Sequence, residues 1–269
     1  MIWLLFISGF LLCCFPAVSN YFQQQRQADA VATYRQAVGK NKEDGLEEAL
    51  ENAEEYNTML FQSGGAFVDQ MDVKILSDES YQRQLDVAGN GIMGSLEIPK
   101  INVELPIYHG TEEEALSNGI GHLQGTSLPV GGVSTHSVLT GHRGLPSSKL
   151  LVRLDEMEEK DLFFLRVCGN TLAYRVTEIK TVEPEDTASL KVKADQDLVS
   201  IITCTPYGIN THRLVVTGER VEYRKAEHAA IKEEIPSVRE LILTALPFVF
   251  AVAAVILFIW DRRHIRYES

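Results

Sequence analysis

The chain has 269 residues, of which 45% are hydrophobic and 23% are charged, and its formal net charge is -12. This composition excludes a wholly disordered chain, which would be poorer in hydrophobic residues. The acidic balance argues against a nucleic-acid-binding protein, because phosphates are bound by clustered Lys and Arg. The four cysteines are too scattered for a disulfide framework, and without a CxxC pair or a His/Cys cluster we expect neither a metal nor another cofactor.

An apolar segment opens the chain. Residues 1–18 carry no charge, and the first charged side chain is Arg26. A helix of about 18 residues spans about 27 Å, which is marginally enough for a bilayer core of about 30 Å. The segment 1–20 therefore predicts either a retained transmembrane anchor or a cleaved signal peptide. The missing basic n-region and the missing cleavage site favour the anchor.

A second apolar segment, 241–260, contains no charged residue and predicts a transmembrane helix. Three arginines lie within the six residues that follow it, at positions 262, 263 and 266. Because cytoplasmic flanks are enriched in Lys and Arg, this pattern predicts a cytoplasmic tail over 261–269. The region between the two spans is then expected to lie outside the cytoplasm.

The first part of that region has a helical pattern. Helices are predicted over 21–38 and 45–62, with the sequence GKNKEDG at 39–45 as the turn between them. The second helix places small and apolar residues at three-to-four spacing, with glutamates on its other face. A further short helix is predicted to begin at a cap formed by Ser77 or Asp78.

From about residue 93 the sequence changes to short β-branched runs separated by Gly, Pro and Asn. Many short strands with few helices favour a closed barrel or a sandwich. The segment 168–171, between two such runs, indicates a β-hairpin. Short helices are expected in TEEEALSNG at 111–119 and in KLLVRLDEM at 149–157.

These changes of texture divide the chain into six parts. The predicted parts are an N-terminal anchor or signal segment, 1–20; a helical extension, 21–92; a β domain, 93–224; a polar stalk, 225–240; a transmembrane helix, 241–260; and a cytoplasmic tail, 261–269.

Two strand ends in the β domain carry residue types suited to nucleophilic catalysis. One β run ends on Cys204, turns through 206–208 and continues into a second strand at Arg213. Strand alternation places Ile202 and Cys204 on one face. Another β run ends just before His142. Side chains at strand ends on a barrel rim can converge while the scaffold stays rigid, so these three polar side chains are candidates for one site.

The segments that carry these residues resemble the sortases, and specifically the pilin-polymerising class C sortases. The matching pieces are TGHRG at 140–144 and ITCTPYGINTHRL at 202–214, with LEIPK at 96–100 and LPIYHG at 105–110 upstream. The resemblance covers about 93–224. It implies a mainly β fold: a closed, eight-stranded sortase-type β-barrel with short helices, an N-terminal helical extension and two flanking transmembrane segments.

The resemblance also implies the chemistry of the site. Cys204 would attack the Thr-Gly carbonyl of an LPxTG-like sorting signal and give a thioacyl enzyme. His142 would protonate the leaving amine and later accept a proton from the incoming amine. Arg213 would stabilise the oxyanion of each tetrahedral intermediate. Thr140 and Thr203 are expected to line or support the substrate groove.

The other histidines and the second cysteine of the β domain are expected to have no catalytic role. We expect His109, His122, His136 and His212 to be structural or to lie on the polar rim, and Cys168 to be a non-catalytic thiol at a turn.

Class C sortases often carry a lid ahead of the barrel, with an Asp-Pro-aromatic motif that covers the active site. This chain has no Asp-Pro pair in that region, and Asp69 with Met71 is the nearest equivalent. Asp72 and Asp78 are rival lid anchors, and an extension without a lid stays open. If Asp69 anchors a lid, its replacement by alanine should raise the rate at which a thiol reagent modifies Cys204.

Together with the apolar segments, this resemblance implies a membrane-anchored cysteine transpeptidase of the Gram-positive cell surface that joins pilin subunits through lysine isopeptide bonds. The expected partners are pilin precursors with LPxTG-like signals, the acceptor lysine of another pilin, and the membrane. The catalytic domain is expected outside the cytoplasm. A cell-wall-anchoring sortase that uses a peptidoglycan amine is one alternative, and a non-catalytic membrane-tethered binding barrel is another.

Overall fold

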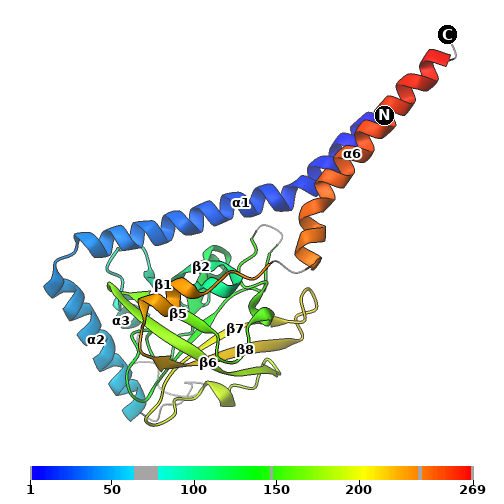
Figure 1. Cartoon of the computed structure of the whole chain (residues 1–269). Coiled ribbons are helices and arrows are strands. Elements are labelled where there is room, and N and C mark those ends of the chain that lie inside the picture. Colours follow the sequence, from blue (N-terminus) through cyan, green and yellow to red (C-terminus); the bar gives the residue numbers. More distant parts are fainter. Residues whose placement is uncertain (1, 64–77, 146–147, 236–237, 268–269) are drawn as a thin grey trace.

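A computed structural model describes residues 2–63, 78–145, 148–235 and 238–267 of the chain. In this part, eight strands close into a β-barrel in the order β1-β2-β3-β4-β7-β8-β6-β5 (Figure 1). The strands are β1 (Ile92–Ile98), β2 (Val103–His109), β3 (Ile120–His122), β4 (Thr135–Thr140), β5 (Leu162–Val167), β6 (Asn170–Val182), β7 (Asp197–Thr205) and β8 (His212–Val221). The closed barrel predicted from the sequence is confirmed.

Two of the pairings in the barrel are parallel, β2 with β3 and β4 with β7, and the others are antiparallel. The parallel pairing of β4 with β7 has a functional consequence, because it brings the carboxyl ends of both strands to the same rim of the barrel. The alternating side chains on the inner face fill the barrel. Leu139, Val199, Ile201 and Val216 belong to this main core and are at most 1% exposed.

The hairpin predicted at 168–171 is confirmed. Val167 of β5 pairs with Asn170 of β6, so Cys168 and Gly169 form a two-residue loop. Both loop residues have positive φ, 46° at Cys168 and 85° at Gly169. Two consecutive positive φ angles are typical of the type I′ turn, whose twist matches that of the paired strands.

The N-terminal helices differ from the prediction at their boundary. α1 (Ile2–Lys40) is one continuous helix through the apolar start and the polar segment that follows, with Pro16 inside it. α2 begins at Glu43 and ends at Gln62, so the turn is shorter than the predicted 39–45 and Gly45 lies within α2. Local charge and glycine content pointed to a longer loop, but the helical hydrogen bonds of α2 continue through it.

Both helices are bound to the barrel. α1 lies along one side of it and α2 along another (Figure 1). The hydroxyl of Tyr34 in α1 donates to the carbonyl of Met93 and accepts from the Cys168 N–H, both at 2.9 Å. From α2, the Asn57 amide pairs with both backbone groups of Leu128, at 3.1 and 2.7 Å. These buried polar pairs fix the register of the helices on the barrel, because leaving either partner unpaired would be costly.

Short helices connect the remaining strands. α3 (Asp78–Arg83) precedes β1, and α4 (Glu113–Asn118) lies between β2 and β3. The helix predicted in 149–157 is not formed as such: the segment makes turns and one 3₁₀ helix, Leu154–Glu156. Further 3₁₀ turns span Pro99–Ile101 and Ala188–Leu190.

The segment after β8 returns across the barrel. It forms α5 (Lys225–Ala230), from which His228 Nε2 lies 2.9 Å from Glu97 Oε1 on β1. Further along, the Glu234 N–H donates to the Lys100 carbonyl at 2.8 Å, and the Glu234 carboxylate lies 3.2 Å from Lys100 Nζ. The predicted polar stalk thus contacts the barrel at His228 and at Glu234.

The chain ends in α6 (Val238–Tyr267), which runs beside the start of α1 away from the barrel (Figure 1). The rings of Phe10 and Phe250 stack at this contact, with their centroids 6.4 Å apart. Within the residues that the structure describes, no helix combines the length and the apolar character needed to cross a bilayer. The two transmembrane segments predicted from the sequence stay predictions.

Candidate active site

Cys204 and Arg213 are direct partners in the β7–β8 ladder. Cys204 is the penultimate residue of β7 and Arg213 is the second residue of β8, so the pair lies at the rim of the barrel. The Arg213 guanidinium donates to the backbone carbonyls of Asn210 and His212, at 3.3 and 3.1 Å. These two bonds hold the cation through backbone groups of its own turn.

His142 is brought to the same rim by the parallel pairing of β4 with β7. Thr140 pairs with Ile202, and beyond the ladder the Gly141 N–H donates to the Ile202 carbonyl at 3.0 Å. The buried hydroxyl of Thr203 donates to the Gly141 carbonyl at 2.8 Å. Because Gly141 is bound on both sides to β7, the residue that follows it, His142, is fixed next to the end of β7.

Arg143 makes a second connection between the histidine segment and β7. Its guanidinium donates to the Thr205 hydroxyl, which follows Cys204, and pairs with the Asp155 carboxylate. The Arg143 side chain is 6% exposed. A buried guanidinium is stable only when it is paired, so this contact connects the segment that carries His142 with the end of β7. Arg143 belongs to the TGHRG motif, but no sequence signal pointed to Thr205 or Asp155 as its partners.

An apolar groove begins beside Cys204 on the outer face of the barrel wall. Val138, Ile202 and Val215 occupy the outward positions of β4, β7 and β8 and form a small cluster with Leu190. Together with Arg213 and neighbouring residues, they line or underlie a cavity of about 340 Å³. Since side chains alternate along β7, Cys204 lies on the same face as Ile202. Cys204 does not itself line the cavity, but its ladder partner Arg213 does, so we expect the thiol just beyond the end of a groove with an apolar floor.

Thr140 and Thr203 have different positions, although both were predicted to line or support the groove. Thr140 lines the cavity at the end of β4. Thr203 is buried, and its hydroxyl is used in the bond to Gly141. Thr203 therefore supports the histidine segment and does not line the cavity.

Comparison with known proteins identifies this arrangement. A family model described as Sortase domain matches residues 96–221. The structure of sortase C1 from Streptococcus agalactiae is 42% identical, with a TM-score of 0.69, and the match covers 73% of this chain and 100% of that one. The chain belongs to the sortase family of cysteine transpeptidases.

Two further structures place this sortase among class C neighbours. Sortase C from Streptococcus pneumoniae is 37% identical, with a TM-score of 0.62, over 72% of this chain and 97% of that one. Sortase C from Clostridium perfringens, solved with the C-terminal cell wall sorting motif, has the same identity and TM-score over 73% of this chain and 100% of that one. Among curated proteins, sortase D of Bacillus subtilis is 32% identical over 131 residues, which are 48% of this chain and 63% of that protein.

The other histidines of the β domain are engaged in structural contacts. His122 is fully buried; its Nε2–H donates to the Ser127 carbonyl at 2.9 Å, and Nδ1 lies 2.9 Å from the Tyr81 hydroxyl. Burial lowers the pKa of His122 from its usual 6.5 to about 4. His136, whose pKa is also lowered by burial, bonds the Ser200 hydroxyl at 2.8 Å.

The other two histidines of the β domain and Cys168 also make contacts within the fold. Both ring nitrogens of His109 contact backbone carbonyls, at 3.0 and 2.7 Å, and His212 Nε2 lies 3.2 Å from the Glu183 carboxylate. Cys168 is buried at its hairpin, and burial raises the pKa of its thiol. A buried thiol with a raised pKa is a poor nucleophile, which agrees with the non-catalytic role expected for Cys168.

The proposed lid residues of this sortase are not described. Asp69 and Met71, and the rival Asp72, fall in 64–77, outside the described residues, and the side chain of Asp78 is likewise outside them. Assignment of a lid stays a prediction.

Proposed function

We propose that this sortase cleaves an LPxTG-like sorting signal between Thr and Gly and transfers the new carboxyl end to an amine. The observation that carries the proposal is the pairing of Cys204 with Arg213 beside His142 at the end of the apolar groove. The Clostridium perfringens structure, solved with a sorting motif, supports a substrate of this class.

The first half of the reaction forms a thioacyl enzyme. The Cys204 thiolate attacks the Thr carbonyl carbon, and the Arg213 guanidinium stabilises the oxyanion of the tetrahedral intermediate. The C–N bond then breaks, and the protonated His142 imidazole gives its proton to the leaving glycine amine. The threonine carboxyl end remains attached to the sulfur of Cys204.

The second half transfers the acyl group. An incoming primary amine attacks the thioacyl carbon, and Arg213 again stabilises the oxyanion. His142 accepts the proton from the attacking amine, the C–S bond breaks, and the Cys204 thiolate is regenerated. The product is an amide, which is an isopeptide bond when the amine is a lysine side chain.

We further propose that the acceptor is a lysine of a second pilin, so that the enzyme polymerises pilins. The support is the set of neighbours: the structure of pneumococcal sortase C is described as giving insight into pilin substrate specificity, and a second sortase C1, 38% identical, is described as that of a pilus island. A peptidoglycan amine remains the alternative acceptor, and both acceptors use the same first half of the reaction.

We also propose that the enzyme is anchored in the cell membrane, with the barrel outside and the C-terminal tail in the cytoplasm. Support comes from the uncharged run 241–260 and the arginines after it. The contact between Phe10 and Phe250, which keeps the apolar ends of α1 and α6 together, also agrees with a common membrane insertion. Protease protection in inside-out vesicles tests the sidedness: cleavage of the barrel from the cytoplasmic face would contradict it.

The deciding experiment uses the full chain in detergent with an LPxTG-type peptide. Mass spectrometry should detect a thioacyl adduct on Cys204 in the parent enzyme, and the adduct should be absent from Cys204→Ala and present in Cys168→Ala. Added pilin with its acceptor lysine should release the adduct as a cross-linked product. Release by a peptidoglycan amine alone would favour the wall-anchoring alternative. If no adduct forms at all, the non-catalytic binding barrel becomes the favoured function.

A further inference from the structure

The imidazole of His142 has a carboxylate next to it that does not belong to the Cys-His-Arg set. Glu113, the first residue of α4, places Oε2 3.5 Å from His142 Nε2. This Nε2 atom is buried and has no hydrogen-bond partner among the described residues. Catalytic hydrogen bonds are often long in the free enzyme and shorten with substrate, so Glu113 is the natural partner for this nitrogen.

Glu113 is itself held by a hydrogen bond. The Ser117 hydroxyl, one turn along α4, donates to Glu113 Oε1 at 2.8 Å. One carboxylate oxygen is thus fixed by α4 and the other is left for the imidazole. The Glu113 side chain is 76% exposed, so without Ser117 its rotamers would be free in solvent.

α4 is in turn connected to α1. The Gln23 side-chain amide donates to the Ser117 carbonyl at 2.9 Å and to the Asn118 side-chain oxygen at 3.3 Å. A continuous series of contacts therefore leads from α1 through Ser117 and Glu113 to the catalytic imidazole. Each member is polar and each contact is directional, which is what positioning a side chain requires.

The same face of α1 also holds the chain that follows His142. Asn20, Gln23 and Gln27 lie on one side of the helix, because their spacing is three and four residues. The Asn20 side-chain oxygen accepts from the Lys149 N–H at 2.9 Å, and the Gln27 amide donates to the Ser148 hydroxyl at 3.3 Å. The two segments on either side of the imidazole are therefore attached to one helix.

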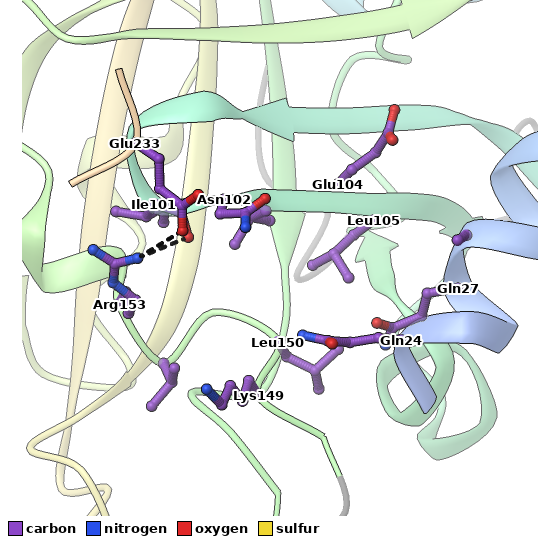
Figure 2. Close-up of a pocket in the computed structure, with 13 residues that line it drawn as sticks. Gln24, Gln27, Ile101, Asn102, Glu104, Leu105, Lys149, Leu150, Arg153 and Glu233 are labelled. Atoms are coloured by element: carbon purple, nitrogen blue, oxygen red, sulfur yellow. Dashed lines mark hydrogen bonds and ion pairs between the residues drawn. The ribbon is translucent and has the colours of Figure 1, made fainter. Parts of the chain in front are cut away.

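Packing alone does not explain this attachment. A cavity of about 290 Å³ lies between α1, the start of β2 and the turn at 149–153. Figure 2 shows Gln24 and Gln27 reaching from α1 toward Leu150 across it. Beside this cavity the hydrogen bonds of Asn20 and Gln27 are directional, so they contribute to the alignment of the helix with the turn.

We propose that Glu113 is a positioning residue for His142, and that α1 sets its orientation through Gln23 and Ser117. The carboxylate orients the ring and stabilises the imidazolium that forms when His142 holds the proton. The inference rests on the proposed function, since it assigns His142 the acid-base role. It makes the N-terminal helix part of the catalytic apparatus as well as an attachment to the barrel.

The test compares Glu113→Gln and Glu113→Asp with Glu112→Gln, a matched charge change at the exposed neighbouring position. We expect Glu113→Gln to lower kcat for thioacyl formation about tenfold with KM and Tm unchanged, because positioning acts on the reacting geometry. Glu113→Asp, which keeps the charge, should restore part of kcat. Glu112→Gln should behave like the parent. An unchanged kcat in Glu113→Gln, or equal losses at both positions, would overturn the proposal.

The connection to α1 is tested separately. Gln23→Leu should lower kcat in the same direction as Glu113→Gln, and the double variant should lose no more than Glu113→Gln alone, since both act through one contact series. Gln25→Leu, at an exposed site on α1, is the control. Additive losses in the double variant would contradict the series.

A second measurement distinguishes failure of the positioning role from failure of the proposed function. The rate at which iodoacetamide alkylates Cys204 is measured on every variant and needs no sorting peptide. If Glu113→Gln leaves this rate unchanged, the positioning role is refuted, whereas a parent enzyme that forms no thioacyl adduct refutes the proposed function.

Discussion

Cys204 and Arg213 face each other as direct partners across two antiparallel strands, so the proposed nucleophile and the proposed oxyanion-stabilising cation are positioned by backbone hydrogen bonds on both sides. A change in either side chain therefore leaves the scaffold of the other intact. This separation makes the chemical roles accessible to substitution.

Arg213 is expected to contribute mainly to the transition state. Arg213→Ala should lower kcat for thioacyl formation about 100-fold, as loss of one oxyanion donor does in other acyl-transfer enzymes. Arg213→Lys keeps a cation but loses the planar fork of the guanidinium, so its kcat should lie between those of the parent and Arg213→Ala. Rapid-quench mass spectrometry of the Cys204 adduct measures the effect. Arg224→Ala, which removes an exposed cation paired with Glu222, is the control and should be neutral.

The groove should select the apolar part of the sorting signal. Leu190→Ser places a hydroxyl in the apolar cluster with Ile202 and Val215, and we expect kcat/KM for an LPxTG peptide to fall about tenfold. The discrimination between peptides with Leu and with Ser at the first position should shrink. Val133→Ser, at a side chain that is 76% exposed elsewhere on the barrel, provides the control. Equal losses of kcat/KM for the Leu and Ser peptides would show that the groove does not recognise the first residue of the sorting signal.

The Arg143–Asp155 pair should respond asymmetrically to substitution. Arg143 is buried and Asp155 is 47% exposed, so Asp155→Asn leaves a buried cation unpaired while Arg143→Met leaves a carboxylate that water can solvate. We expect Asp155→Asn to lower the free energy of unfolding by about 3 kcal/mol and Arg143→Met to lower it less. Urea unfolding measures both. A larger loss of unfolding free energy in Arg143→Met than in Asp155→Asn would show that the contact with Thr205 stabilises the fold more than the charge pair does.

His122 should make the fold less stable in acid. Its pKa falls from 6.5 in the unfolded chain to about 4 when buried. Between these values the unfolded chain binds a proton that the folded chain does not, so the free energy of unfolding falls by about 3 kcal/mol as pH drops from 6.5 to 4 and is fully retained above 6.5. Urea unfolding across this range should show the loss, and His122→Gln should remove that part of it. If His122→Gln does not fold, NMR of the parent serves instead, and an imidazole that protonates near pH 6.5 contradicts the prediction.

Much of the fold could be predicted because its signals are local. The hairpin at 168–171 could be predicted from the Gly-Asn pair at 169–170 between two β-branched runs, although the positive φ of Cys168 could not. Alternation along β7 placed Ile202 and Cys204 on one face, and the structure puts Ile202 beside the groove. The apolar side of α2 was also visible in sequence, and Ala53 is fully buried there.

What could not be predicted depends on contacts between distant segments. Arg143 is an unremarkable motif residue until β4 and β7 pair and bring Thr205 within reach. Glu113 is one of three consecutive glutamates, and only the placement of α4 distinguishes it from its neighbours. The helix expected at 149–157 was replaced by turns because the Leu151 N–H bonds back to the His142 carbonyl, at 3.2 Å, and Leu150 takes a positive φ. Those constraints come from tertiary structure and leave no periodic trace.

The attachment of Glu234 to Lys100 limits the distance between the barrel and α6. Burial opposes the charge of Lys100, but its hydrogen bonds with Asp161, Glu234 and Glu158 outweigh this cost and raise its pKa, so the cation persists at any physiological pH. Glu234 is then four residues from Val238, and four residues reach at most about 14 Å. Because the connection is this short, the groove of the barrel stays close to α6. A substrate held near the same helix is therefore present at the groove at a high effective concentration, whereas a substrate released into solution is present only at its bulk concentration.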